Sequence, residues 1–237
     1  MRKCLALIAV GVLLGFTSSK AQDVVPSSGN KSGIQKPSRD FVMLQFTYEN
    51  WLNAPDSINI SGLGRGFNAY LCYDWPLGKS NFSFAAGVGI GTSNIYFNNQ
   101  QLVFTDTGSA GSQVSFIDEQ RDYKKYKLTT AYFEAPFELR FFSNKENRNK
   151  GFKAAAGLRV GTLVGAHTKG RYNVEGVKVV EKINTKRYLE NWRFAATLRL
   201  GYGNFSVMGT YNLNGLFKPN AGPEVTPYSV GICITGL

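Results

Sequence analysis

Six charged residues in the second half of the chain are the side chains most able to do chemistry together. Each lies in a segment where apolar and polar residues alternate, on the polar side: Glu134, Glu138, Arg140, Arg159, Arg193 and Arg199. Carboxylate and guanidinium groups held close together can relay protons or a charged substrate, or they can neutralise one another as buried ion pairs. If the chain folds back about residues 146–147, Glu134 lies opposite Arg159, which predicts an ion pair between them.

Residues that could serve nucleophilic catalysis or bind a metal are scarce. His167 is the only histidine and the only possible base for a lipid acyltransferase or deacylase; its position predicts that it shares the polar face, but no nucleophile and acid accompany it. Cys72 and Cys233 lie on polar faces too far apart for a disulfide, which predicts two buried free thiols. No CxxC pair and no cluster of His and Cys suggests zinc. We therefore expect no enzyme, no metal and no cofactor.

The segments that position these residues share one pattern, strict alternation of apolar and polar side chains. Period two predicts a β-strand with unlike faces, and each run is close to the 9–11 residues that a transmembrane strand needs. The runs cover residues 41–49, 66–73, 81–90, 132–141, 153–164, 192–202, 205–213 and 228–235. Eight amphipathic strands are expected.

The connections between these strands alternate between short and long. Short ones lie near residues 76–79, 144–151 and 203–204, and long ones near 50–63, 98–125, 168–189 and 214–225. This asymmetry is typical of bacterial outer-membrane barrels, with short turns and both termini in the periplasm and long loops outside the cell. The sequence thus predicts an all-β fold, an eight-stranded antiparallel transmembrane β-barrel in the bacterial outer membrane.

A soluble barrel with its apolar face inward is the alternative fold. It is disfavoured because bulky apolar residues fill nearly every position of one face and would overfill an eight-stranded interior. Glycines on the opposite face suit a narrow lumen, and aromatic residues at both strand ends resemble interfacial girdles. A lumen of this size holds side chains only, so we favour an electrostatic plug over a proton or substrate path for the six charged residues.

The N-terminus carries export signals. Arg2 and Lys3 precede an apolar run that ends before the small residues Ser19 and Ala21, which predicts a signal peptide over residues 1–21. The run is shorter than the roughly 20 apolar residues of a membrane anchor. Residues 22–39, rich in Ser, Gly, Pro and Lys, are expected to form a flexible periplasmic leader, and residues 40–237 the barrel domain.

The chain is basic. Of its 27 Lys and Arg, three lie in the signal peptide, which leaves 24 against 16 Asp and Glu. An exported protein rarely meets nucleic acid, so we expect no nucleic-acid partner. Most of the basic residues lie in long connections, where lipopolysaccharide phosphates could neutralise them. The alternative is that these connections are ordinary solvated loops whose basic residues bind no lipopolysaccharide.

Several stretches of the chain resemble a known family. They are LQFTYENWLNAPDSI (44–58), DWPLGKSNFSFAAGVGIGTSNIYF (74–97), YKKYKLTTAYFEAPFELRFFSNKENRNKGFKAAAGLRVGTLVGAHTKG (123–170) and GYGNFSVMGTYNLNGLFKPNAGPEVTPYSVGICITGL (201–237). Together they resemble the outer-membrane β-barrel family of the Bacteroidota, most closely its PorT (SprT) members.

The resemblance implies an outer-membrane component required for type IX secretion, which exports surface proteases and adhesins. It also implies contacts with other secretion-system proteins besides outer-membrane lipid, and it carries over no catalytic motif. A structural or adhesive barrel without a role in secretion is the alternative.

Overall fold

The computed structural model describes residues 41–105, 114–144, 147 and 150–236. These residues form eleven strands: β1 Val42–Leu52, β2 Gly64–Pro76, β3 Phe82–Phe97, β4 Gln100–Phe104, β5 Val114–Asp118, β6 Tyr123–Phe142, β7 Phe152–Val174, β8 Val177–Asn184, β9 Trp192–Tyr202, β10 Phe205–Asn212 and β11 Thr226–Thr235. Nothing in this part of the chain is a helix long and apolar enough to span a bilayer. The predicted signal peptide and leader lie outside the described residues.

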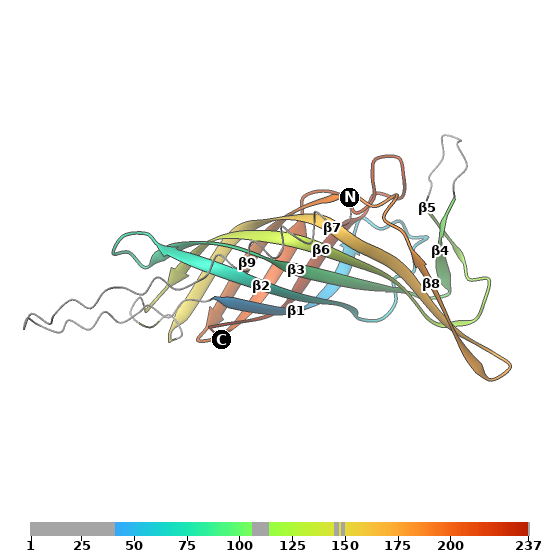
Figure 1. Cartoon of the computed structure of the whole chain (residues 1–237), viewed down its shortest axis with the longest axis horizontal. Coiled ribbons are helices and arrows are strands. Elements are labelled where there is room, and N and C mark those ends of the chain that lie inside the picture. Colours follow the sequence, from blue (N-terminus) through green and yellow to red (C-terminus); the bar gives the residue numbers. More distant parts are fainter. Residues whose placement is uncertain (1–40, 106–113, 145–146, 148–149, 237) are drawn as a thin grey trace, which may run out of the picture. The chain divides into compact units, whose positions relative to one another are not determined.

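Eight of the strands close into a barrel. Their order around the ring is β1, β2, β3, β6, β7, β9, β10 and β11, and β11 pairs with β1 to complete it (Figure 1). All pairings are antiparallel, and these eight strands are the eight that the alternation predicts. The prediction of an all-β, eight-stranded antiparallel barrel is confirmed.

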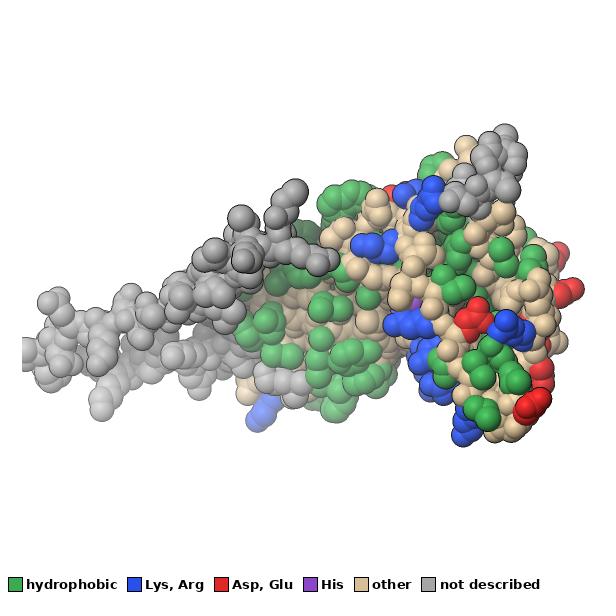
Figure 2. Space-filling view, turned by 45° about the vertical axis from the view of Figure 1, so that its right-hand side comes forward, with side chains coloured by type: hydrophobic (Ala, Val, Ile, Leu, Met, Phe, Trp, Pro, Cys, Tyr) green, Lys and Arg blue, Asp and Glu red, His purple; other side chains and the backbone are tan. Residues whose placement is uncertain are grey.

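The apolar side of each strand faces outward. Large hydrophobic side chains such as Phe67, Leu71, Phe133 and Leu198 are 43–57% exposed, and Figure 2 shows hydrophobic side chains gathered over one part of the surface. We call this outward face of the barrel the apolar belt. The polar sides of the strands are buried in the lumen, so the soluble barrel is excluded.

The short connections are tight turns at one rim. The two-residue turn between β9 and β10 depends on Gly203, whose φ of 61° is rarely adopted by other residues. β1 begins and β11 ends at this rim, since Thr235 pairs with Met43 and its N–H donates to the carbonyl of Asn204. We call it the short-turn rim and the opposite end the long-loop rim.

At the long-loop rim the sheet continues beyond the barrel. β6 and β7 are 20 and 23 residues long, and β8 adds to the free edge of β7 (Figure 1). Separately, β4 and β5 form a two-stranded hairpin. β4, β5 and β8 fall in segments that the sequence assigns to long connections. β8 was missed because most of its side chains are exposed on both faces, which leaves no alternation to detect.

A β-bulge changes the facing of β7. The register of β6 and β7 shifts where Tyr132 pairs with Leu163 and Ala131 pairs with Gly165. A bulged residue reverses the alternation beyond it. His167 therefore lies on the outward face and is half-buried, so the prediction that it shares the polar face is wrong.

An apolar cluster fills the mouth of the barrel at the long-loop rim. Trp51 is its centre, with ring centroids 5.5 Å from Phe97 and 6.3 Å from both Phe116 and Phe217. Isolated bridges between Ile60 and Phe97, and between Leu189 and Phe217, tie the loops to this cluster. We call it the apolar cap.

Candidate functional site: the charged lumen

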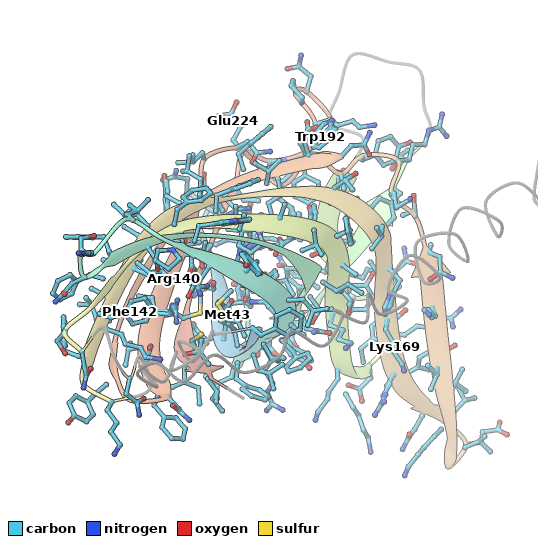
Figure 3. The ribbon with its side chains drawn as sticks, turned by 60° about the vertical axis from the view of Figure 1, so that its left-hand side comes forward. Met43, Arg140, Phe142, Lys169, Trp192 and Glu224 are labelled. Atoms are coloured by element: carbon cyan, nitrogen blue, oxygen red, sulfur yellow. The ribbon has the colours of Figure 1, made fainter. Side chains whose placement is uncertain are left out.

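All six charged residues singled out from the sequence point into the lumen. The most exposed of them, Arg193, is 6% exposed, and Glu134 is fully buried. They form two groups, one around Glu134 and one around Glu138. Figure 3 shows Arg140 and Met43 inside the ring of strands.

The first group surrounds Glu134 on β6. Its carboxylate lies 3.1 Å from Nη1 of Arg193 and 3.5 Å from Nη1 of Arg159, and it accepts a 2.5 Å hydrogen bond from the Tyr70 hydroxyl. The guanidinium of Arg159 also lies 4.9 Å from the centroid of the Tyr70 ring. One carboxylate therefore joins strands β2, β7 and β9 to β6.

Neutral side chains add further hydrogen bonds to these two arginines. Arg159 donates to Oε1 of Gln45 at 3.0 Å, and Asn68 donates to the same oxygen at 3.1 Å. Arg193 donates through Nε to Oδ1 of Asn212 at 3.0 Å. Buried charges are tolerable only when paired and hydrogen-bonded in this way.

The second group surrounds Glu138, which lies on the same face of β6, four residues nearer the short-turn rim than Glu134. Oε2 of Glu138 lies 2.7 Å from Nε of Arg140 and 2.9 Å from Nη2 of Arg199. Nη1 of Arg140 reaches Asp74 on β2 at 3.0 Å. This group links β6 to β2 and β9.

A sulfur-rich cluster contacts the Glu134 group: Met43, Tyr70, Cys72, Met208 and Cys233. Tyr70 binds Glu134, and Gln45, which binds Arg159, lies 3.4 Å from Sδ of Met43 and 4.0 Å from Sγ of Cys233. Cys72 and Cys233 are buried free thiols, as the sequence predicts.

Glycines make room for the Glu134 side chain. A Cβ on Gly91 would lie 2.6 Å from a carboxylate oxygen of Glu134, and a Cβ on Gly161 would lie 2.8 Å from its Cγ. These glycines lie on β3 and β7, the two neighbours of β6. The lumen is narrow, so the Glu134 side chain fits only because glycines, which have no side chain, occupy the neighbouring positions on β3 and β7.

The lumen is filled. Near Glu49, Trp51 and Arg193 a cavity of about 20 Å³ remains, which is room for about one water. Five basic and four acidic side chains are buried among the described residues, so charge is nearly balanced. An ion or solute cannot diffuse through such an interior.

The ion pair predicted between Glu134 and Arg159 forms, but the expected register is wrong by two residues. Glu134 pairs with Gly161, and Arg159 pairs with Pro136. The two side chains meet diagonally rather than directly across the strands, which long side chains on one face can do.

Three buried charged residues were not among the sequence candidates: Glu49, Asp74 and Lys153. Glu49 and Lys153 lie at the ends of predicted runs and have polar-face parity, and extension of the second run by one residue would have added Asp74. Glu49 accepts a 2.5 Å hydrogen bond from Thr47, and Lys153 donates to the Thr235 hydroxyl at 3.3 Å.

The lumen offers little for catalysis. His167 lies outside it, and in the described part of the chain no group of three His, Cys, Asp or Glu side chains could hold a metal ion. The arrangement suits pinning of strands and neutralisation of buried charge.

The sequence profile of a family described as outer membrane protein beta-barrel domain matches residues 5–218. No curated protein and no solved structure matches the chain.

Proposed function

Since the chain belongs to the family of outer membrane protein β-barrel domains, we propose that it is a non-enzymatic component required for type IX secretion of surface proteases and adhesins. The filled lumen carries this proposal, because a barrel that passes no solute must act through its surfaces. The choice of the type IX system rests on the resemblance of the strands, turns and loops to PorT (SprT) members.

The proposal includes an orientation. The long-loop rim faces the cell exterior, and the short-turn rim, with both chain termini, faces the periplasm. The asymmetry of the connections supports this arrangement. The signal peptide, residues 1–21, would be removed on export, and the leader, residues 22–39, could contact periplasmic components.

The hairpin of β7 and β8 is the surface best suited to contact another secretion protein. Its tip is the two-residue turn Glu175-Gly176, with φ of 47° and 84°, a conformation typical of tight hairpins. Val174 and Val177 flank the turn and are 49% and 66% exposed. β8 is the last strand in the sheet order, and an edge strand can accept a strand from a partner.

Deletion of the gene tests the secretion role. We expect cargo with a C-terminal sorting domain to accumulate in the periplasm, as measured by fractionation and immunoblotting, and the wild-type gene to restore export. Normal export in the deletion strain would refute the role.

Complementation with point variants tests the hairpin. The variant Val174→Ser/Val177→Ser should restore export poorly. Leu77→Ser, which removes an apolar side chain of similar exposure at the short-turn rim, should restore it fully. Equal complementation by both variants would exclude the hairpin tip as the contact.

The remaining proposed partners are outer-membrane lipid and lipopolysaccharide, without nucleic acid.

The non-enzymatic role is tested separately by His167→Ala. We expect an unchanged lipid A mass spectrum, and a changed spectrum would indicate a lipid-modifying enzyme instead.

A structural or adhesive barrel is the second candidate. The apolar cap favours it, because the cap fixes the loops into a firm outer surface without requiring a secretion partner. This role predicts a fragile envelope with normal cargo export in the same deletion strain.

A further inference from the structure

The outward face of the extended sheet carries a concentrated positive charge. We call the basic face the outward side chains Lys125, Lys127, Lys169, Arg171 and Lys182. Across the strands Lys127 lies opposite Lys169, Lys125 opposite Arg171, and Lys169 opposite Lys182. Like charges directly opposite one another destabilise a sheet, so this face is arranged for something other than stability of the isolated protein.

No carboxylate within the described residues compensates these charges on the same face. The nearest acidic side chain on β8, Glu181, pairs with Gly170 on the opposite face and accepts a 2.9 Å hydrogen bond from the Tyr123 hydroxyl. The positive potential is therefore available to an anion.

The basic face contains a shaped cleft. It has a volume of about 150 Å³ and is lined by Tyr96, Lys125, Lys127, Lys169 and Arg171.

Hydrogen bonds fix the central lysine of this cleft. Nζ of Lys127 donates to Oδ1 of Asn94 at 2.6 Å, and the Thr129 hydroxyl donates to the same oxygen at 2.9 Å. Nζ also lies 5.8 Å from the centroid of the Tyr96 ring. Held in this way, Lys127 loses less side-chain entropy when it binds an anion.

The basic face lies next to the apolar belt. Along β3 and β6 the outward residues change from Ile90 and Phe133 of the belt, through Thr92, Asn94 and Thr129, to Tyr96 and Lys127. Lys and Arg side chains gather beyond the hydrophobic area in Figure 2, and Lys169 lies on the part of β7 that continues past the barrel in Figure 3. A ligand here would have apolar groups on the belt and anionic groups on the basic face.

We propose that the basic face binds the phosphate groups of lipid A in the outer leaflet, while the acyl chains of the same molecule pack on the apolar belt. This site rests on the lipopolysaccharide contact and the orientation proposed above, and it is independent of the secretion role. A lipid supplies both the charge and the apolar chains that the two adjacent surfaces require, which a free phosphate ion does not.

The test uses the purified full chain in detergent micelles and measures bound lipid A by native mass spectrometry. The variant Lys127→Gln/Lys169→Gln should weaken binding about 30-fold, given the free energy typical of a basic residue at an anionic membrane surface. The matched control Lys79→Gln/Lys150→Gln removes the same charge at the short-turn rim and should bind like wild type. The gel shift of the unboiled barrel checks that each variant is folded.

Two further arms use the wild-type protein and so do not depend on folding of a variant. Dephosphorylated lipid A should bind about as weakly as lipid A binds the double variant. Inorganic phosphate at millimolar concentration should not displace lipid A, because it lacks acyl chains.

Equal binding of phosphorylated and dephosphorylated lipid A, or displacement by inorganic phosphate, would overturn the site. Loss of binding in the control pair instead would place lipid A at the short-turn rim and overturn both the site and the orientation. Normal cargo export in the gene deletion would refute the secretion role without changing any of these binding results.

Discussion

Removal of the negative charge at Glu134 is the sharpest test of the lumen network. Glutamine has nearly the same size as glutamate, so Glu134→Gln leaves packing intact and changes the charge alone. Arg193 and Arg159, 3.1 Å and 3.5 Å from the carboxylate, would then lose the carboxylate with which both form an ion pair. Their remaining acceptors, Gln45 and Asn212, are neutral.

The expected loss of stability follows from these distances. Each charge pair contributes about 4 kcal/mol at a separation of about 4 Å and an effective dielectric constant of about 20, and desolvation of the ions offsets part of this. Removal of one partner of a buried pair typically costs about 3–5 kcal/mol, which we expect for Glu134→Gln. The double variant Glu134→Gln/Arg159→Gln removes one of the two arginine charges that lost their partner. Its loss of unfolding free energy should therefore be about 1–3 kcal/mol smaller than the sum of the losses in the single variants.

Urea unfolding of the barrel in lipid vesicles measures these free energies, with tryptophan fluorescence and the heat-dependent gel shift as two probes of folding. The control is Glu224→Gln, at an exposed loop position, which should change the free energy of unfolding by less than about 0.5 kcal/mol. A cost below about 1 kcal/mol for Glu134→Gln, or strict additivity in the double variant, would refute the ion network as a stabilising element.

Three further outcomes follow from the packing. Gly161→Val should destabilise the barrel by about 1–3 kcal/mol, because its Cβ would lie 2.8 Å from Cγ of Glu134; an unchanged urea midpoint would mean that the lumen has spare room. Trp51→Ala should cost about 3–5 kcal/mol and make the long loops more sensitive to protease, and protection equal to wild type would contradict a packed cap. Cys72 and Cys233, both buried, should react with a water-soluble maleimide only after unfolding, so mass-spectrometric labelling of the folded barrel would show that water enters the lumen.

The eight barrel strands could be predicted because one physical cause acts on all of them. Lipid on one side and a polar lumen on the other impose period-two alternation. β8 has no such asymmetry, since solvent reaches most of its side chains. β4 and β5 contribute to the apolar cap, whose members come from strands and loops far apart in the sequence.

The charged lumen residues could be identified from parity, but their pairing could not. Glu134 and Arg159 sit two positions away from the expected register, because the turn between β6 and β7 decides the register and the sequence does not fix its geometry. A single bulge likewise turned His167 outward. The odd or even position of a residue predicts which face of the strand it lies on only as long as no bulge interrupts the pairing of that strand.

The pairing of β1 with β11 gives assembly of this barrel an all-or-none character. Until the last strand arrives, β1 and β10 both present unpaired backbone N–H and C=O groups, which hydrocarbon does not tolerate. A partly inserted chain therefore has no stable smaller form in the bilayer. The cell would have to hold the strands at the membrane surface, or within an insertion machine, until both ends of the sheet can join.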